Sequence, residues 1–158
     1  MLLGVHHAGI TVADLDRSIK FYSDVLNAEL VWRHDAIATE YARAVVGLPD
    51  ARMNGALMSI PGGGSIELIK YDAPEGDVIR PRPCDTGSTH VAFVVDDVPS
   101  LFEQLLEAGV EVVSDSRSTR GGNSRGGLTL YARDPDGAFL EFMQLPPANA
   151  ELDSKEKR

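Results

Sequence analysis

The chain has 158 residues, 43% of them apolar, so it can form one ordinary domain or two small modules with a buried core. Its net charge of -9 argues against a nucleic-acid partner, because phosphate binding needs clustered Lys and Arg. No apolar run approaches the roughly 20 residues that span a bilayer, so we expect a cytoplasmic protein without membrane contact. Cys84 is the sole cysteine, which excludes an internal disulfide and a thiolate metal cluster.

The first half of the chain alternates between strand and helix patterns. Asp14 is expected to cap a helix, because the apolar residues that follow it recur at helical spacing as far as Asn27. Gly62 to Gly64 separate two strand-like runs and predict a hairpin. The expected elements are strands over residues 4–12, 29–33, 51–60 and 65–71, a helix over 15–27 and a short helix over 38–46.

The second half repeats this order after a linker. Residues 72–86 contain three prolines and several charges, which is a linker composition, and they separate a first module (4–71) from a second (87–145). Residues 146–158 are polar enough to predict a disordered tail. The expected elements of the second module are strands over 89–95, 110–113, 128–133 and 138–144, and a helix that begins after Asp97 and stops at Gly109.

Two pairs of sequence motifs indicate internal duplication. Residues 7–15 match residues 90–98 position for position, and each segment begins with a His. Residues 61–69 share with residues 135–143 a Pro, a Gly two residues later and a Glu six residues after the Pro. Each half therefore supplies one His near its start and one Glu near its end, and duplication of this kind determines the architecture.

The predicted repeat unit is βαβββ, present twice, which places the chain in the α+β class. A small curved sheet with one helix covers a single face, so two such units are expected to pair. Their concave faces would then surround a shared cavity, giving a cup-shaped mixed sheet.

Strand alternation directs four polar side chains to the concave side. His7 and His90 point away from the apolar residues of the helix side, and Glu67 and Glu141 each lie between apolar neighbours that take the opposite face. Two isolated carboxylates there would be very unfavourable without a cation. We therefore predict a divalent metal ion (nickel, zinc, cobalt, manganese or iron) bound by these four residues. The alternative for each residue alone is a hydrogen-bonded structural His or a solvated Glu.

These motifs resemble the vicinal oxygen chelate superfamily, which includes glyoxalase I, methylmalonyl-CoA epimerase, extradiol dioxygenases and the bleomycin and fosfomycin resistance proteins. The resemblance covers about residues 4–145 and rests on four segments: residues 7–22, Ile66 to Leu68, His90 to Phe93, and Asp134 to Gly137 ahead of Glu141. It implies the paired-module fold and a homodimer. Modules in this superfamily pair within one chain or across a dimer.

The ligand set narrows the reaction that the resemblance implies. Glyoxalase I-like members carry His, Glu, His and Glu, as here, whereas epimerases of CoA esters usually have Gln where this chain has Glu67. Extradiol dioxygenases have a catalytic His where this chain has Asn123, and metal-free antibiotic binders lack the ligands. The favoured hypothesis is a metal-dependent lyase or isomerase that abstracts a proton next to a carbonyl. By resemblance, Glu141 is the base and Glu67 its partner.

The substrate is predicted to be a small molecule of unknown identity. Bacterial glyoxalase I often has an Arg that holds glutathione where this chain has Thr11, which argues against glutathione. Residues considered for substrate binding are Arg120, Asn123, Arg125, Tyr131, Phe139 and Met143. A binding protein is the competing hypothesis, because the same cavity could hold a small hydrophobic or polyoxygenated molecule without reacting with it. Ile69, Phe139 and Met143 share the proposed inward faces, and they could equally pack between the modules. Metal content would separate the two hypotheses.

Overall fold

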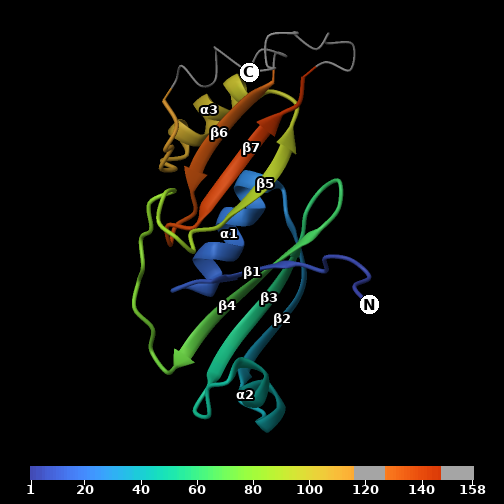
Figure 1. Cartoon of the computed structure of the whole chain (residues 1–158), viewed down its shortest axis with the longest axis vertical. Coiled ribbons are helices and arrows are strands. Elements are labelled where there is room, and N and C mark those ends of the chain that lie inside the picture. The colour runs from blue at the N-terminus through green and yellow to red at the C-terminus, as the bar shows by residue number, and fades with distance from the viewer. Residues whose placement is uncertain (116–126, 147–158) are drawn as a thin grey trace. The chain divides into compact units, whose positions relative to one another are not determined.

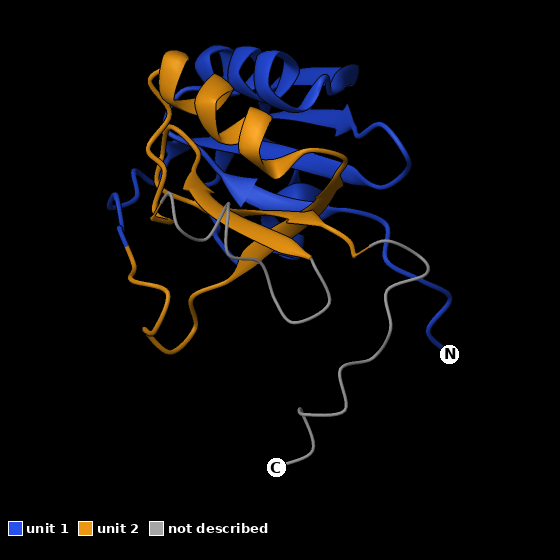
Figure 2. Cartoon of the chain, turned by 90° about the horizontal axis from the view of Figure 1, so that it is seen from above, with its two compact units in different colours: residues 1–80 blue, residues 81–158 orange. Residues whose placement is uncertain are grey.

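The computed structural model describes residues 1–115 and 127–146, which fall into two compact units over residues 1–80 and 81–158 (Figures 1 and 2). The predicted α+β class is confirmed, because each unit contains an open mixed sheet and at least one helix. The boundary between the units lies inside the predicted linker. The predicted tail lies outside the described residues from position 147 onward. Across the described part of the chain, no helix has the length and apolar character needed to cross a membrane.

Unit 1 is a four-stranded sheet with α1 along one face (Figure 2). Its central strand β4 pairs in parallel with β1 and antiparallel with β3. Four side chains of β3 and β4 form its core with α1, and each is at most 1% exposed: Ala56, Met58, Ile66 and Leu68. The elements are β1 (Ala8–Thr11), α1 (Leu15–Leu26), β2 (Glu29–Ile37), α2 (Glu40–Val46), β3 (Arg52–Ser59) and β4 (Ser65–Ala73), with strand order β1-β4-β3-β2.

Side-chain caps set the helix boundaries of unit 1. Asp14 accepts a hydrogen bond from the Arg17 backbone N–H at 3.0 Å, and Asn27 ends α1 in the left-handed conformation. α2 begins at Glu40, later than the predicted residue 38. Thr39 accepts a bond from the Ala42 N–H at 3.1 Å and so serves as its cap.

Strand β2 is longer than predicted and contains two irregularities. Leu30 pairs with Met58 and Trp32 with Leu57, so Val31 is an extra residue opposite the regular β3. A second irregularity follows His34, where the Ala36 N–H donates to Asn54 Oδ1 at 2.8 Å. Each bulge changes which side chains face α1, because strand side chains alternate with period two.

Unit 2 is a three-stranded sheet with strand order β5-β7-β6. Its elements are β5 (His90–Val95), α3 (Val98–Glu107), β6 (Leu128–Arg133) and β7 (Phe139–Gln144). The parallel β5–β7 pair and the antiparallel β7–β6 pair repeat the arrangement of β1, β4 and β3. Asp97 caps α3 by accepting from the Ser100 N–H at 3.1 Å, as Asp14 does in unit 1.

The predicted strand over residues 110–113 is wrong as a regular element. It is reduced to an isolated antiparallel bridge between Val112 and Ala132. The N–H groups of Val113 and Ser114 both donate to the Tyr131 carbonyl, at 2.8 and 3.2 Å. Two consecutive donors that share one acceptor form a bulge, so this segment pairs irregularly with β6.

Candidate metal centre

Equivalent turns precede the two predicted Glu ligands. In unit 1 the Gly63 N–H donates to the Ile60 carbonyl at 3.0 Å, and in unit 2 the Gly137 N–H donates to the Asp134 carbonyl at 3.0 Å. A second bond across each turn joins the same relative positions, at 3.1 Å in unit 1 and 2.9 Å in unit 2. The Pro and Gly of both motifs therefore form the same tight connection, and the Glu follows four residues after the Gly.

Strand register brings each Glu beside its His. Glu67 of β4 pairs with Gly9 of β1, two residues after His7. Glu141 of β7 pairs with Ala92 of β5, two residues after His90. Since residues two apart in a strand share a face, the imidazole and the carboxylate are diagonal neighbours in both units. The small residue at each intervening position leaves space between them.

The side chains of each pair are in contact. His7 Nε2 lies 3.2 Å from Glu67 Oε2, and His90 Nε2 lies 3.0 Å from Glu141 Oε2. We call these two contacts the unit-1 pair and the unit-2 pair. The Glu141 side chain is 14% exposed and the Glu67 side chain 25%, so both carboxylates are partly removed from water.

The two N–O separations fit a shared divalent metal. Two ligand atoms at about 2.1 Å from one ion are about 3.0 Å apart at a right angle and about 3.4 Å apart at the tetrahedral angle. Both observed separations lie in this range, so neither pair would need to change its spacing to accept an ion. Imidazole nitrogen and carboxylate oxygen suit zinc, nickel, cobalt, manganese and iron(II).

Each unit by itself supplies two residues of the predicted set. Within their described residues, neither unit gathers three or more His, Cys, Asp or Glu side chains that could hold a metal ion. The four-ligand site therefore stays a prediction that depends on the two pairs meeting.

A second histidine contacts His7 from the side away from Glu67. His6 Nδ1 lies 2.7 Å from His7 Nδ1, with the two rings edge to face and their centroids 5.0 Å apart. If His7 carries its proton on Nδ1 and donates it to His6, the lone pair of His7 Nε2 faces Glu67 and is available to a metal. Partners of this kind commonly fix the tautomer of a ligating imidazole.

The surroundings of the two carboxylates differ. Leu57 pairs with Glu67 across β3 and β4, whereas Tyr131 takes the equivalent position beside Glu141 across β6 and β7. The Tyr131 side chain lies next to the Glu141 carboxylate across the two strands, and its ring lies 5.4 Å from that of His90. Burial, followed by the interaction with the Glu141 carboxylate, raises the pKa of Tyr131 above its ordinary value of 10.0. Tyr131 is therefore a neutral donor at pH 7.

The residues considered for substrate binding have different placements. Tyr131, Phe139 and Met143 share the sheet face of Glu141, as the register requires. Ile69 likewise shares the face of Glu67. Phe139 is 3% exposed and is therefore mainly a packing residue. Arg120, Asn123 and Arg125 lie outside the described residues.

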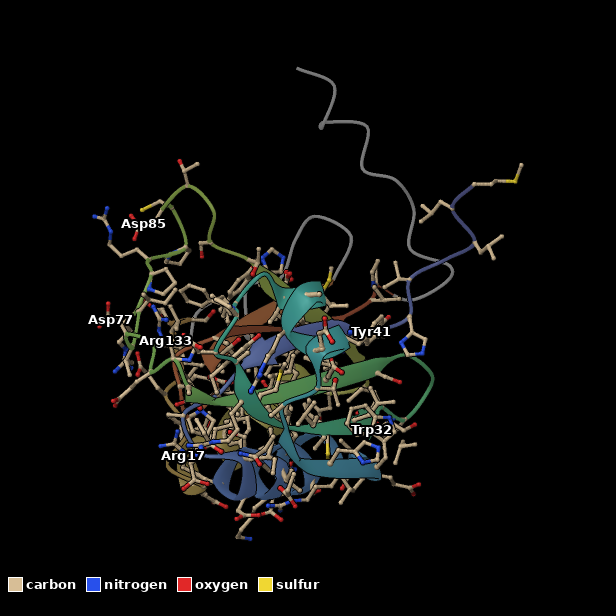
Figure 3. All side chains as sticks on the ribbon, turned by 90° about the horizontal axis from the view of Figure 1, so that it is seen from below. Arg17, Trp32, Tyr41, Asp77, Asp85 and Arg133 are labelled. Carbon is tan, nitrogen blue, oxygen red and sulfur yellow. The ribbon has the colours of Figure 1, made fainter. Side chains whose placement is uncertain are left out.

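Arg133 supports this face of unit 2 and was not anticipated. Its guanidinium lies 4.0 Å from the centroid of the Phe139 ring and donates to the carbonyls of Gly137 and Pro81 at 2.6 and 2.7 Å (Figure 3). It also lies 3.3 Å from a carboxylate oxygen of Glu111. An Arg next to a turn ordinarily indicates solvent, so nothing in the local sequence pointed to an 8% exposed cation.

Comparisons with known proteins agree with this architecture. The family model described as the glyoxalase/bleomycin resistance protein/dioxygenase superfamily matches residues 4–142. A 2-epi-5-epi-valiolone epimerase from an Actinomyces species is 32% identical over 91% of this chain and 80% of its own length. A probable lactoylglutathione lyase from Vibrio parahaemolyticus is 30% identical over 93% of this chain and 94% of its own.

Solved structures show the same fold. A glyoxalase family protein from Bacillus cereus superposes with a TM-score of 0.80 at 25% identity, covering 93% of this chain and 97% of its own. The fosfomycin resistance protein FosX from Listeria monocytogenes, solved with Mn(II) and sulfate, has a TM-score of 0.61 at 20% identity, covering 92% of this chain and 94% of its own. The chain belongs to the glyoxalase/bleomycin resistance protein/dioxygenase superfamily.

Proposed function

We propose that the protein is a metal-dependent isomerase or lyase that transfers a proton at a carbon next to a substrate carbonyl. The observation that carries the proposal is the repeated His–Glu contact, formed by the same diagonal register in both units with N–O distances of 3.2 and 3.0 Å. Together the two pairs would hold one divalent ion through two imidazoles and two carboxylates. When bound, such an ion polarises substrate oxygens and stabilises the charge that develops as the proton leaves.

The carboxylates of the two pairs have distinct roles in this proposal. Glu141 removes the proton, because the His90 imidazole contacts one of its oxygens and the neutral Tyr131 side chain lies beside it. Each carboxylate has two oxygens, and the one that does not face its imidazole is assigned to proton transfer. Glu67, protonated from solvent, gives its proton to the substrate, and Glu141 releases the proton that it took to solvent. A lyase of the lactoylglutathione type and an epimerase both fit this chemistry, and both names occur among the relatives.

The pairs must come together for this reaction, either within one chain or across a homodimer. Mixing separately inactive His7→Ala and His90→Ala variants distinguishes the two arrangements. If each site uses unit 1 of one protomer and unit 2 of the other, a mixed dimer regains one intact site of the two. If both pairs belong to one chain, every site in the mixture lacks an imidazole and activity stays absent. Sedimentation of the wild-type chain gives its assembly independently.

The decisive experiment combines metal analysis with isotope exchange. The purified protein should contain about one divalent ion per pair of units and should exchange a substrate α-proton with solvent deuterium. Suitable substrates to screen are hemithioacetals, α-hydroxyketones and acyl-CoA esters, with catechols and oxygen uptake as the test for a dioxygenase. Glu141→Gln should slow exchange by at least about 100-fold. Glu103→Gln, the same substitution at an exposed position of α3, should leave it unchanged.

Two results would overturn the proposal. Full exchange in Glu141→Gln would remove the proposed base. Protein that binds no divalent ion would favour a role in binding small molecules without turnover.

A further inference from the structure

The bulge at Val31 turns Trp32 toward the face of the unit 1 sheet that carries His7 and Glu67. Leu30 pairs with Met58, whose side chain packs on the α1 side of the sheet. Regular alternation would put Trp32 on that side as well, because it is two residues from Leu30. The inserted residue instead pairs Trp32 with Leu57. Bulges next to functional sites commonly redirect one side chain in this way.

Neighbouring contacts confirm the direction of the side chain. Arg33, the next residue, forms an ion pair with Asp16 of α1 and therefore faces the helix. Trp32 and His34 on either side of it face the opposite way, and their rings lie 5.1 Å apart with a tilt of 33°. Figure 3 labels Trp32 beside β2.

Trp32 and Glu67 lie in one row across the sheet. Trp32 pairs with Leu57, Leu57 pairs with Glu67, and Glu67 pairs with Gly9, the residue two positions after His7. Adjacent strands are about 4.8 Å apart, so the backbones of Trp32 and Glu67 are about 10 Å apart with one apolar side chain between them. A small molecule held by the unit-1 pair would extend over Leu57 to the indole.

The indole of Trp32 packs over Gly55. A Cβ atom added at Gly55 would lie 3.4 Å from Cζ3 and 3.7 Å from Cη2 of Trp32, which is ordinary van der Waals contact. The Trp32 side chain is half-buried. A residue larger than Ala at position 55 would displace the ring, whereas Gly leaves it in place.

The fold itself does not require a Trp at this position. In unit 2 the equivalent row runs through Glu141 and Tyr131, and the backbone N–H groups of Val113 and Ser114 both donate to the Tyr131 carbonyl. Neither residue is aromatic, so unit 2 forms without an aromatic side chain where unit 1 has the sole Trp of the chain.

We propose that Trp32 is a stacking surface for a ring, so that the substrate of this site is a cyclic hydroxyketone or a related ring compound rather than an open-chain molecule. The inference rests on the proposed function, because it places the reacting carbonyl at the unit-1 pair. The indole is flat and apolar and lies on the same face of the sheet as the unit-1 pair. This arrangement suits a ring whose edge carries oxygens and whose face carries C–H groups.

A matched pair of α-hydroxyketones tests the inference with the purified full-length protein. The ring probe is 2-hydroxycyclohexanone, and the open-chain probe is 4-hydroxyhexan-3-one, which has the same number of carbons and the same reactive group. Because Trp32 is the sole Trp, indole fluorescence reports on this position alone. The ring probe should change it saturably, and calorimetry should show binding up to about tenfold tighter than that of the open-chain probe.

Variants identify the residue responsible. Trp32→Leu should abolish the preference for the ring and leave the affinity for the open-chain probe within about twofold. Trp32→Phe, which keeps a smaller ring, should retain part of the preference. Tyr41→Leu is the control, because Tyr41 is an aromatic residue of the same unit that is 80% exposed on α2 (Figure 3). It should behave as wild type.

The inference is overturned if the ring probe does not bind, if it binds without changing the fluorescence of the wild-type protein, or if Trp32→Leu and Tyr41→Leu have equal preferences. The wild-type fluorescence decides the question even if a Trp32 variant fails to fold. Deuterium exchange separates this outcome from the proposed function. Ring-selective binding without exchange refutes proton transfer alone, and exchange without ring preference refutes the stacking role alone.

Discussion

Replacing Tyr131 by Phe should weaken metal binding without changing stability appreciably. The substitution keeps the ring beside His90 and removes the hydroxyl that is available to donate to the neighbouring Glu141 carboxylate. A hydrogen bond to a charged acceptor contributes about 1.5–3 kcal/mol, and the lower end applies because Tyr131 and Glu141 are not fully buried. Since 1.36 kcal/mol is a factor of ten, the dissociation constant for zinc or nickel should rise about tenfold. Losses of about 10–100-fold are usual when a residue that orients a metal ligand is removed.

Calorimetric titration of metal-free protein with zinc or nickel measures this effect. Tyr71→Phe is the matched control, because Tyr71 lies on the same face of β4 as Glu67 but four residues further along the strand, about 13 Å away. It should leave metal affinity unchanged. Equal affinities for wild type, Tyr131→Phe and Tyr71→Phe would show that the hydroxyl does not orient Glu141, and the distinction between the two carboxylates would then fail.

Three further predictions concern stability. The hydrogen bond from Lys70, followed by other partners, lowers the pKa of Asp72 from its ordinary 3.8, so the stability that Asp72 contributes is present above that pH and lost as the pH falls. In Asp72→Asn, the urea concentration at the midpoint of unfolding should therefore fall less steeply with decreasing pH than in the wild type. Gly55→Ala should be tolerated, whereas Gly55→Val should displace Trp32, alter its emission and cost about 1–3 kcal/mol in urea unfolding; equal stabilities would contradict the packing argument. Arg133→Lys cannot reproduce the guanidinium contacts and should cost about 1–3 kcal/mol; an unchanged thermal midpoint by circular dichroism would refute this.

The repeated parts of the fold could be predicted because each is determined locally. Asp14 and Asp97 cap equivalent helices, and the Pro and Gly of each turn form the same hydrogen bonds. The Glu then follows four residues after the Gly in both turns. Strand alternation predicted the face of each His and Glu, whereas their contact also depends on the register of β1 with β4 and of β5 with β7, which the strand pairing supplies.

Features that depend on a single inserted residue could not be predicted. Leu30, Val31 and Trp32 all favour strands, so no composition signal marks Val31 as an extra residue, and simple alternation places Trp32 on the wrong face. Residues 110–113 have a strand composition, yet two consecutive donors share one carbonyl and the pairing is reduced to one bridge. The Tyr131–Glu141 contact becomes visible after the register of β6 with β7 is known.

The difference between Leu57 and Tyr131 has a consequence for the division of labour between the two halves of the chain. Two carboxylates in identical surroundings would be interchangeable as acid and base. Here one carboxylate has an aliphatic neighbour and the other a phenol. Such a difference makes the two carboxylates inequivalent, so two halves that share one fold can take different parts in a reaction.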